Sequence, residues 1–515
     1  MNQLTLPMSL EDMIPKNHVV RVANTFIGQM SLDSLLDKYQ GGGPSYYHPE
    51  MMLKVLMYAY TQKVWSSRQI AKALRENVNF MWLAGSNKPD FRTINRFRLS
   101  MKDVIDEVFQ ALMNYLLERK LILLETYFMD GTKIEANASK YSFVWKKGTE
   151  KNQDKLRQKV SKLLEEIDNA NELENGIYGD KDLAELGEDA IDDPDALEKL
   201  VQNLNEKLAN KSKSKRDKSV RITRKAVRTL EKDCLPRAKK YKFVLGTIGN
   251  QRNSMSKTDP DATFMRMKDD HMNNGQLKPG YNVQIGTENQ FVVGFSLHQR
   301  PGDTCCLREH IERVKNIYGK HPEKVVADAG YGSEENYEYL EEKKIQSYVK
   351  YNMFHKEQKQ KFTKDAFKKE NMPYDEETDT FTCPNGKELT FSFIKKSKNG
   401  NGYISEVRVY QCKECTNCPY VDKCLKGKVQ HGRRIEINRR LNELRAKSRE
   451  NLMSEAGIAL RKRRCIEPEY VFGRLKWCWG FKRFLLRGIE KTKLEWGLLC
   501  IAHNLTKLAA LGVTK

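Results

Sequence analysis

The sequence predicts an α/β protein built on a mixed sheet flanked by helices. Two alternating apolar runs, GYNVQIGT (280–287) and NQFVVGFSLHQ (289–299), indicate a β-hairpin with TENQ as its turn. A helical pattern over 304–318 and a short apolar strand, KVVA (324–327), follow along the chain. With an earlier apolar run that ends at Asp130 and a further strand within 346–352, the order of elements describes a mixed sheet with helices packed on it.

Asp328 occupies the position where the strand 324–327 ends. Gly330 and Gly332 break the pattern, and Ser333 is a good N-cap for a helix that begins with two glutamates. A carboxylate at the end of a buried strand is held rigidly and still faces solvent, which suits a metal ligand. A single Asp-x-Gly is more often a turn cap, so the metal-site interpretation depends on other acids with similar surroundings.

Two further acids have such surroundings. The apolar run LILLETYFM leads into Asp130 and Gly131, as the strand before Asp328 leads into Asp328. Near the C-terminus, EPEYVFGRLK combines Glu469 with Lys476, which lies seven residues later and therefore two turns along one helix face, and Arg464 precedes them. A surface helix with salt bridges is the alternative for this last segment. Four aromatic residues there are predicted to be core and not base-stacking: Trp477, Trp479, Phe481 and Phe484.

Residues 10–120 are predicted to be helical throughout. In PDFRTINRFRLSM the apolar residues Phe91, Ile94 and Phe97 recur on one face, which leaves a polar and basic face outward, made of Arg92, Asn95, Arg96 and Arg98. Short helices joined by tight breaks, the last with such a face, fit a helix-turn-helix-like DNA reader. A helical bundle with a solvated basic face fits the segment equally well.

The character of the chain changes between about 145 and 245. Apolar residues in heptad-like spacing over 156–167 and 197–208 predict two antiparallel helices joined by an acid-rich, solvated loop. The basic run that follows, KSKSKRDKSVRITRKAVR, is either a solvated linker or a segment that contacts phosphates.

Five of the eleven cysteines cluster late in the chain, at Cys383, Cys412, Cys415, Cys418 and Cys424. Two overlapping C-x2-C units with a further cysteine nearby suit tetrahedral Zn²⁺ in a structural role, with an iron–sulfur cluster as the weaker alternative. Reduced thiols without a metal are the other alternative, and five candidates for four positions leave the ligand set open.

Composition narrows the class of protein. The chain has 515 residues, enough for two to four modules, and a net charge of +22 that favours a polyanionic partner, nucleic acid before a membrane surface. No apolar run approaches the roughly 20 residues that span a bilayer, and the N-terminal residues have no export signal. We therefore expect a cytoplasmic, nucleoid-associated protein without a membrane partner.

Taken together, these motifs resemble the DDE transposases of bacterial insertion sequences, whose catalytic domain has a ribonuclease-H-like fold. The resemblance rests on the helical segment 10–118, the cysteine-rich stretch and five motifs, namely DGTKIEAN, GYNVQIG, ADAGYGSEEN, EPEYVFGRLK and GFKRFLLRG. It implies a catalytic triad of Asp130, Asp328 and Glu469 that binds two Mg²⁺ or Mn²⁺ ions. Glu469 is preferred to Glu467 because its distances from Phe472 and Lys476 match the family pattern.

The resemblance also implies a domain organisation. It predicts a helical DNA-binding domain over 1–120, a helical insertion over 145–245 and a cysteine-rich insertion over 354–429. The catalytic domain is then assembled from 121–144, 246–353 and 430–515. Arg464 and Lys476 are expected to position DNA phosphates, and Arg92, Asn95, Arg96 and Arg98 to contact the terminal repeats.

The implied chemistry explains why hard oxygen ligands are needed. Two divalent ions about 3.5–4 Å apart activate the attacking oxygen and stabilise the leaving one. A metal-activated water would cut at the element's end, and the freed 3′-OH would then attack target DNA. The expected partners are the terminal inverted repeats, the target duplex and a second copy of the chain in a synaptic dimer. Competing interpretations are a nuclease that does not join DNA, a DNA-binding protein without catalysis and a zinc-stabilised interaction protein.

Overall fold

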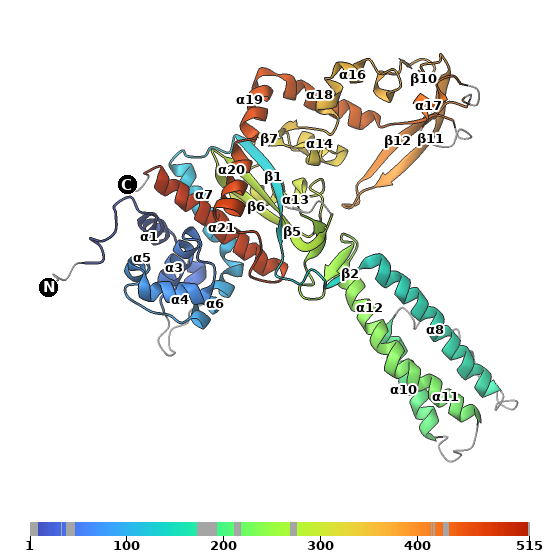
Figure 1. The fold of residues 1–515 in the computed structure, drawn as a ribbon, viewed down its shortest axis with the longest axis horizontal. Helices are drawn as coiled ribbons and strands as arrows, with labels where there is room; N and C mark the ends of the chain where they lie inside the picture. The colour runs from blue at the N-terminus through green and yellow to red at the C-terminus, as the bar shows by residue number, and fades with distance from the viewer. Residues whose placement is uncertain are drawn as a thin grey trace. The chain divides into compact units, whose positions relative to one another are not determined.

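The computed structural model describes residues 9–31, 33–37, 47–172, 193–210, 218–267, 275–413, 415, 418–425 and 432–512. The chain forms two compact units (Figure 1). The first contains Met1–Asn137, Met267–Asp269 and Tyr281–Lys515, and the second Ala138–Arg266 and Asp270–Gly280. None of the helices in the described ranges has both the length and the apolar character needed to cross a bilayer.

A mixed six-stranded sheet confirms the predicted α/β class. Its order is β4–β5–β1–β7–β8, with β6 also paired to β5. The strands are β1 (Thr126–Glu135), β4 (Thr263–Arg266), β5 (Leu277–Glu288), β6 (Phe291–His298), β7 (Lys324–Ala327) and β8 (Gln346–Val349). β7 pairs in parallel with both β1 and β8, whereas β5 is antiparallel to β4 and β6. The predicted hairpin is confirmed as β5 and β6, and its turn residues Asn289 and Gln290 have φ of 51° and 59°, as a type I′ turn requires.

Helices pack against this sheet and place the C-terminal segment beside it. α13 and α21 pack on β6, α14 and α18 on β8, α19 on β7 and α20 on β1. Their bounds are α13 (Leu307–Tyr318), α14 (Glu334–Glu342), α18 (Arg439–Met453), α19 (Glu455–Arg464), α20 (Glu467–Gly473) and α21 (Ile489–Ala510), with a 3₁₀ turn η3 (Ala329–Tyr331) and a π-helical turn η6 (Arg474–Cys478). Ser333 caps α14, as predicted, by accepting a hydrogen bond from the Asn336 amide.

The N-terminal segment is helical, as the sequence predicts. Its elements are α1 (Val19–Gln29), α2 (Asp33–Leu36), α3 (Pro49–Thr61), α4 (Ser67–Glu76), α5 (Val78–Leu83), α6 (Phe91–Ser100), η1 (Met101–Asp103) and α7 (Ile105–Glu118). The long C-terminal helix α21 packs against α1, α3 and α7. The C-terminal helix therefore packs into the N-terminal helical segment and forms part of its core.

A buried carboxylate lies on α21 where it meets these helices. Glu495 is fully buried and accepts hydrogen bonds from the backbone amides of Leu485 and Leu486. Burial raises its pKa from 4.5 to about 7, and Arg98 opposes this only in part.

The raised pKa of Glu495 predicts that its contribution to stability is full below the unfolded pKa near 4.5 and is lost as the pH rises through about 7. The difference corresponds to a free energy on the order of 3 kcal/mol. We expect Glu495→Gln, whose amide oxygen can still accept both backbone bonds, to remove this loss between pH 5 and 8. Urea unfolding of both proteins at the two pH values measures it, and parallel pH profiles would refute the assignment.

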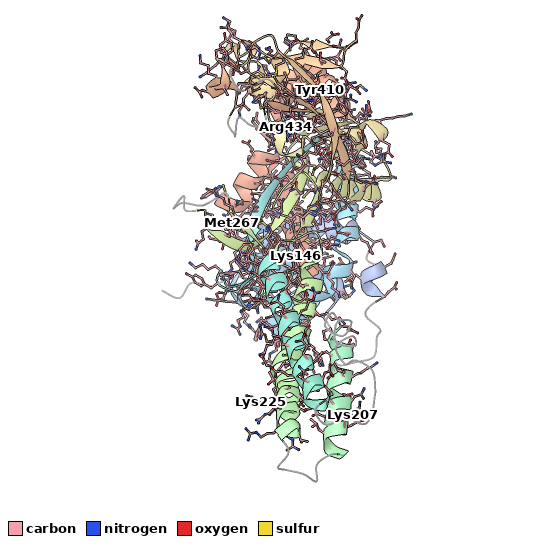
Figure 2. The ribbon with its side chains drawn as sticks, turned by 90° about the vertical axis from the view of Figure 1, so that its right-hand side faces the viewer. Lys146, Lys207, Lys225, Met267, Tyr410 and Arg434 are labelled. Atoms are coloured by element: carbon pink, nitrogen blue, oxygen red, sulfur yellow. The ribbon has the colours of Figure 1, made fainter. Side chains whose placement is uncertain are left out.

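The second unit is mainly a helical bundle made of α8 (Lys146–Glu172), α10 (Pro194–Asn210), α11 (Lys218–Thr229), the π-helical η2 (Leu230–Cys234) and α12 (Leu235–Ile248), with the short strands β2 (Phe143–Trp145) and β3 (Ser254–Ser256). Lys146, Lys207 and Lys225 mark α8, α10 and α11 in Figure 2. The two predicted heptad-like helices are confirmed as α8 and α10. Heptad-like spacing predicts Leu163 as a core residue, but Leu163 is partly buried and the neighbouring Leu164 is fully buried. Most of the acid-rich loop lies outside the described residues.

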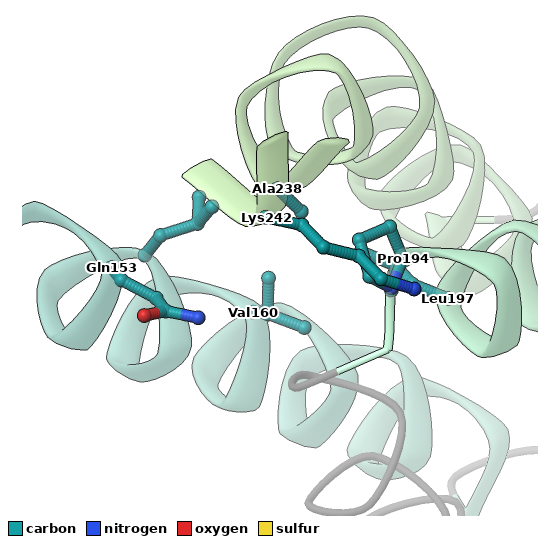
Figure 3. A pocket seen from close by; sticks show the side chains of 7 residues that line it. Gln153, Val160, Pro194, Leu197, Ala238 and Lys242 are labelled. Atoms are coloured by element: carbon teal, nitrogen blue, oxygen red, sulfur yellow. The ribbon is translucent and has the colours of Figure 1, made fainter. Parts of the chain in front are cut away.

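Two further features of this unit correct or qualify the sequence analysis. The basic run is predicted to be either a solvated linker or a segment that contacts phosphates. From Lys218 onward it is not a linker but the helix α11, because Ala226, Val227 and Leu230 fit into the bundle core. A gap between α8, α10 and α12, seen in Figure 3, measures about 10 Å³ and is lined by Val160, Leu197 and Ala238 among others. Because this space would barely hold one water molecule, it is a packing gap and not a ligand site.

The cysteine-rich stretch carries a separate five-stranded antiparallel sheet in the order β13–β12–β11–β10–β9. Its strands are β9 (Tyr374–Asp375), β10 (Thr380–Thr382), β11 (Glu388–Lys398), β12 (Ile404–Gln411) and β13 (Arg434–Ile437), and short helical turns accompany them at α15 (Phe354–Glu357), α16 (Gln360–Thr363), η4 (Lys369–Asn371) and α17 (Val421–Cys424). Tyr410 and Arg434, labelled in Figure 2, mark this sheet. The boundaries predicted for the domains stay predictions.

Candidate active site

Asp130 lies on β1, and Asp328 directly follows the neighbouring parallel strand β7. The register of β1 and β7 pairs Thr126 with Lys324 and Phe128 with Val326, and two residues after Phe128 and Val326 come the two aspartates. Asp328 follows the last residue of β7, as predicted. Asp130 differs from the prediction because β1 continues to Glu135, so this acid lies within the strand and not at its end.

A single arginine joins the two acids. Nη2 of Arg464, the last residue of α19, lies 3.5 Å from Oδ1 of Asp130 and 3.6 Å from Oδ2 of Asp328. The Arg464 and Asp130 side chains are buried, at 9% and 11% exposure, whereas Asp328 keeps 42%. Two carboxylates near enough to share one cationic nitrogen fit a divalent cation, since hard ions bind oxygen ligands of this kind.

Glu469 is placed differently from the two aspartates. It lies in the first turn of α20 with its side chain exposed. Within the described residues, no three His, Cys, Asp or Glu side chains are grouped so that they could hold a metal ion. The structure thus brings two of the three predicted acids together and does not join the third to them in one ligand set.

The carboxylate of the neighbouring Glu467 is buried and hydrogen-bonded within the fold. Its carboxylate is 3% exposed, accepts the Gln290 amide at 2.6 Å and accepts the Arg463 Nε at 3.2 Å. These bonds tie α20 to the turn of the β5–β6 hairpin. Because this carboxylate is already engaged in the fold, Glu469 is the better candidate of the two for binding a ligand.

Lys476 lies beside Thr132 on β1, but on a different kind of helix from the one that the sequence predicts. The segment was expected to continue α20 as one regular helix, but it is the π-helical turn η6, which changes which residues share a face. Lys476 is 6% exposed, and its Nζ lies 3.3 Å from Oγ1 of Thr132. Thr132 is two residues from Asp130 on β1, hence on the same face of the strand. Of the aromatic residues predicted to be core, Trp479, Phe481 and Phe484 are buried, but Trp477 is 58% exposed.

A network of amide and carboxyl groups beside the aspartates was not predicted to belong to the site. Oδ1 of Asp303 accepts hydrogen bonds from Asn282 Nδ2 at 2.7 Å and from Gln284 Nε2 at 2.9 Å. The hydroxyl of Tyr331, in turn, donates to Gln284 Oε1. Burial raises the pKa of Tyr331 well above its usual value, and the charges of Asp303, Asp130 and Asp328 raise it further, so this hydroxyl stays a neutral donor.

The signal for this network was present in the sequence. Asn282 and Gln284 are polar residues inside an otherwise apolar strand, both fully buried, and a buried amide needs a partner. Lys350, which follows β8, is a second missed residue. Burial lowers its pKa, and the Arg464 charge lowers the pKa further, whereas the Asp328 charge raises it. Lys350 is therefore close enough to Arg464 and Asp328 to interact with both electrostatically.

The predicted basic face of α6 borders an open groove of about 450 Å³ lined by Ser66, Ser67, Arg68, Phe91, Arg92, Asn95 and Arg96. Arg92 and Arg96 are exposed and Asn95 is half-buried. The prediction that Arg98 points outward is wrong. Arg98 is 5% exposed and donates to the Trp65 carbonyl at 2.9 Å and to Asn95 Oδ1 at 2.7 Å, because it stabilises the junction between helices.

The cysteine cluster forms part of a small core. Cys412 and Cys415 are buried among apolar residues of the five-stranded sheet, and Cys383 packs against the same cluster. Cys418 and Cys424 are half-buried, and these five cysteines form no disulfide among the described residues. Since the described residues contain no group suited to a metal, the predicted zinc site finds no support in this structure.

Comparison with known families matches the two ends of the chain. A family model described as a transposase DDE domain matches residues 382–509, and one described as a transposase domain (DUF772) matches residues 8–100. No curated protein and no solved structure matches the chain. DDE transposase domains act on DNA and generally use divalent metal ions. The first match contains Glu469, Arg464 and Lys476, and the second contains the α6 groove. Both matches are to transposase domains, and together they support a DDE transposase of an insertion element.

Proposed function

We propose that this transposase cuts DNA at the ends of its element and joins the freed 3′ ends to target DNA, on a sheet of the ribonuclease-H-like type. The observation that carries the proposal is the convergence of Asp130 and Asp328, 198 residues apart in the chain, on the Arg464 guanidinium. Such a pair of carboxylates at adjacent parallel strands suits the binding of divalent ions. The five-stranded sheet with its cysteines is proposed to be an insertion in this catalytic domain.

In this proposal the residues have distinct roles. Asp130, Asp328 and Glu469 would hold Mg²⁺ or Mn²⁺, which would supply Lewis-acid activation of the attacking oxygen and compensation of charge on the leaving oxygen. Arg464 and Lys476, both largely buried, present fixed positive charge toward a phosphate bound beside Asp130 and Thr132. Fixed charge of this kind stabilises the developing negative charge without reorganisation.

The α6 groove is proposed to bind the terminal repeats. Arg92 and Arg96 are exposed beside Asn95, and Arg68 from α4 borders the same groove. Arginine and asparagine side chains on one helix can contact both phosphates and base edges in the major groove. Because each transposition event must bring two element ends together, we propose a homodimer in the synaptic complex.

Strand transfer in vitro tests the proposal. The purified full-length chain would be incubated with Mg²⁺, a duplex that ends in a pre-cut element end, and a supercoiled target plasmid. Joined products that disappear with a chelator are expected. Cleavage without joining would indicate a nuclease, and neither cleavage nor joining would overturn the proposed chemistry.

Gly131 offers a subtler test of the geometry. A Cβ at this position would lie 2.2 Å from Gln284 Nε2 and 2.8 Å from Asp303 Oδ1. Gly131→Ala should therefore push the Gln284 amide off Asp303 and shift the neighbouring Asp130, lowering the rate of strand transfer by about tenfold or more. Gly473→Ala is the matched control, because a Cβ there meets nothing within 4 Å. Equal rates for the two variants would mean that the network does not position Asp130.

A further inference from the structure

The outer face of α11 carries a row of cations. Arg221, Arg224, Lys225 and Arg228 are exposed, and their spacing of three, four and seven residues places them on one side of the helix. The opposite side, with Ala226, Val227 and Leu230, is buried in the bundle core. We call these four cations the α11 stripe, and Figure 2 labels its member Lys225 on the bundle surface.

Several cations on other helices of the bundle, unlike those of the stripe, form ion pairs with acids. Lys159 and Arg237 pair with Asp233 at 2.8 Å and 3.3 Å. Likewise, Lys239 pairs with Glu198 at 2.8 Å, and Lys242 pairs with Asp193 at 2.8 Å.

The stripe has no such compensation in the part of the chain that the structure describes. No acid occurs in the sequence between Val220 and Leu230, and none of the four stripe residues takes part in an ion pair with another described residue. Like charges three and four residues apart destabilise a helix by a few tenths of a kcal/mol per pair. An anionic partner would offset this repulsion.

The dimensions of the stripe suit duplex DNA. From Arg221 to Arg228 the helix rises about 10 Å, at about 1.5 Å per residue. One DNA strand carries a phosphate about every 3.4 Å along the duplex axis, so this length faces about three phosphates of a strand.

We propose that α11 binds the sugar-phosphate backbone of DNA without reading its sequence, as a contact separate from the α6 groove and the aspartates. The proposal rests on the proposed function only in taking DNA as the partner. The helical insertion is thereby assigned a role in holding DNA. Its four cations are long, flexible side chains on an exposed helix face, and contacts to phosphates carry no sequence information, so this contact would add affinity and salt dependence but no sequence preference.

The test compares two variants that remove the same charge. The stripe variant carries Arg221→Gln, Arg224→Gln, Lys225→Gln and Arg228→Gln, and the control variant replaces the ion-paired Lys159, Arg237, Lys239 and Lys242 by Gln. Binding of a random-sequence duplex is measured for each full-length protein over a range of salt concentrations. Thermal unfolding establishes that both variants are folded.

The stripe variant is expected to bind about tenfold or more weakly, with a log–log salt slope shallower by about 2 to 4, since each lost phosphate contact removes about 0.9. The control variant should change much less. Equal losses in both variants would mean that only net charge matters, and unchanged binding of the stripe variant would remove α11 from the DNA contact. Because the readout is binding, it stands apart from any failure of cleavage or joining.

Discussion

Asp130→Asn and Asp328→Asn are each expected to lower the rates of DNA cleavage and strand transfer by more than about a hundredfold while DNA binding is retained. Loss of a residue that hydrogen-bonds to a metal ligand already lowers metal affinity or activity about 10–100-fold, so loss of a direct ligand should lower the rate further. Asparagine keeps the size of the side chain but lacks the charge that a divalent ion requires. Single-turnover cleavage and a gel-shift assay on the same preparations measure the two properties.

An exposed aspartate far from both strands provides the control for these variants. Asp422 lies on α17, and Asp422→Asn changes the net charge equally. It should leave both rates unchanged. If either active-site variant kept more than a tenth of the wild-type rate, that aspartate would not be a metal ligand.

Substitutions of the two glutamates of α20 extend this prediction, because one should lower activity and the other should lower stability. Glu469→Gln is expected to lose activity with an unchanged melting temperature, since its side chain is exposed. Glu467→Gln should mainly lower the melting temperature, because it weakens a buried carboxylate that accepts the Gln290 amide and pairs with Arg463. The reverse pattern would assign the third acid to Glu467.

Gly286→Ala is expected to destabilise the fold by more than about 3 kcal/mol, as overpacking at a site with no room to move. A Cβ on Gly286, in β5, would lie 1.7 Å from Cζ of Tyr127 on the neighbouring β1. The Tyr127 ring cannot withdraw easily. It is fully buried, and its hydroxyl lies 2.6 Å from Nε2 of His310. The other ring nitrogen of His310, Nδ1, is hydrogen-bonded to the hydroxyl of Ser296. Burial raises the pKa of Tyr127 and lowers that of His310, so both stay neutral in this network.

The urea midpoint of unfolding measures the effect of Gly286→Ala. Gly246→Ala, in the last turn of α12, is the matched control, because a Cβ there meets nothing within 4 Å. Alanine is the better helix former, so the control should be as stable as the wild type or more stable by up to about 1 kcal/mol. A midpoint for Gly286→Ala equal to that of the wild type would show that the sheet can separate to admit a methyl group.

Local patterns were sufficient for the elements and for the candidate acids. The alternation in 280–299 predicted β5 and β6, the apolar run before Asp328 predicted β7, and Ser333 predicted the start of α14. Each of these depends on residues close in the chain, whose conformational preferences act over a few positions. The same reasoning could not show that α11 is a helix and not a linker, because this depends on the core that its apolar side meets.

Patterns in the amino-acid sequence were enough to predict the α/β class, most elements of the sheet and the resemblance that the two family matches bear out. The folded chain was needed to place Arg464 between Asp130 and Asp328, and to show that Glu467 is engaged within the fold and that Arg98 is buried. It also brought Asp303 and Gln284 beside the aspartates. The physical reason is that these contacts join residues distant in the chain. Their partners are set by strand register and helix packing, which no short-range pattern encodes.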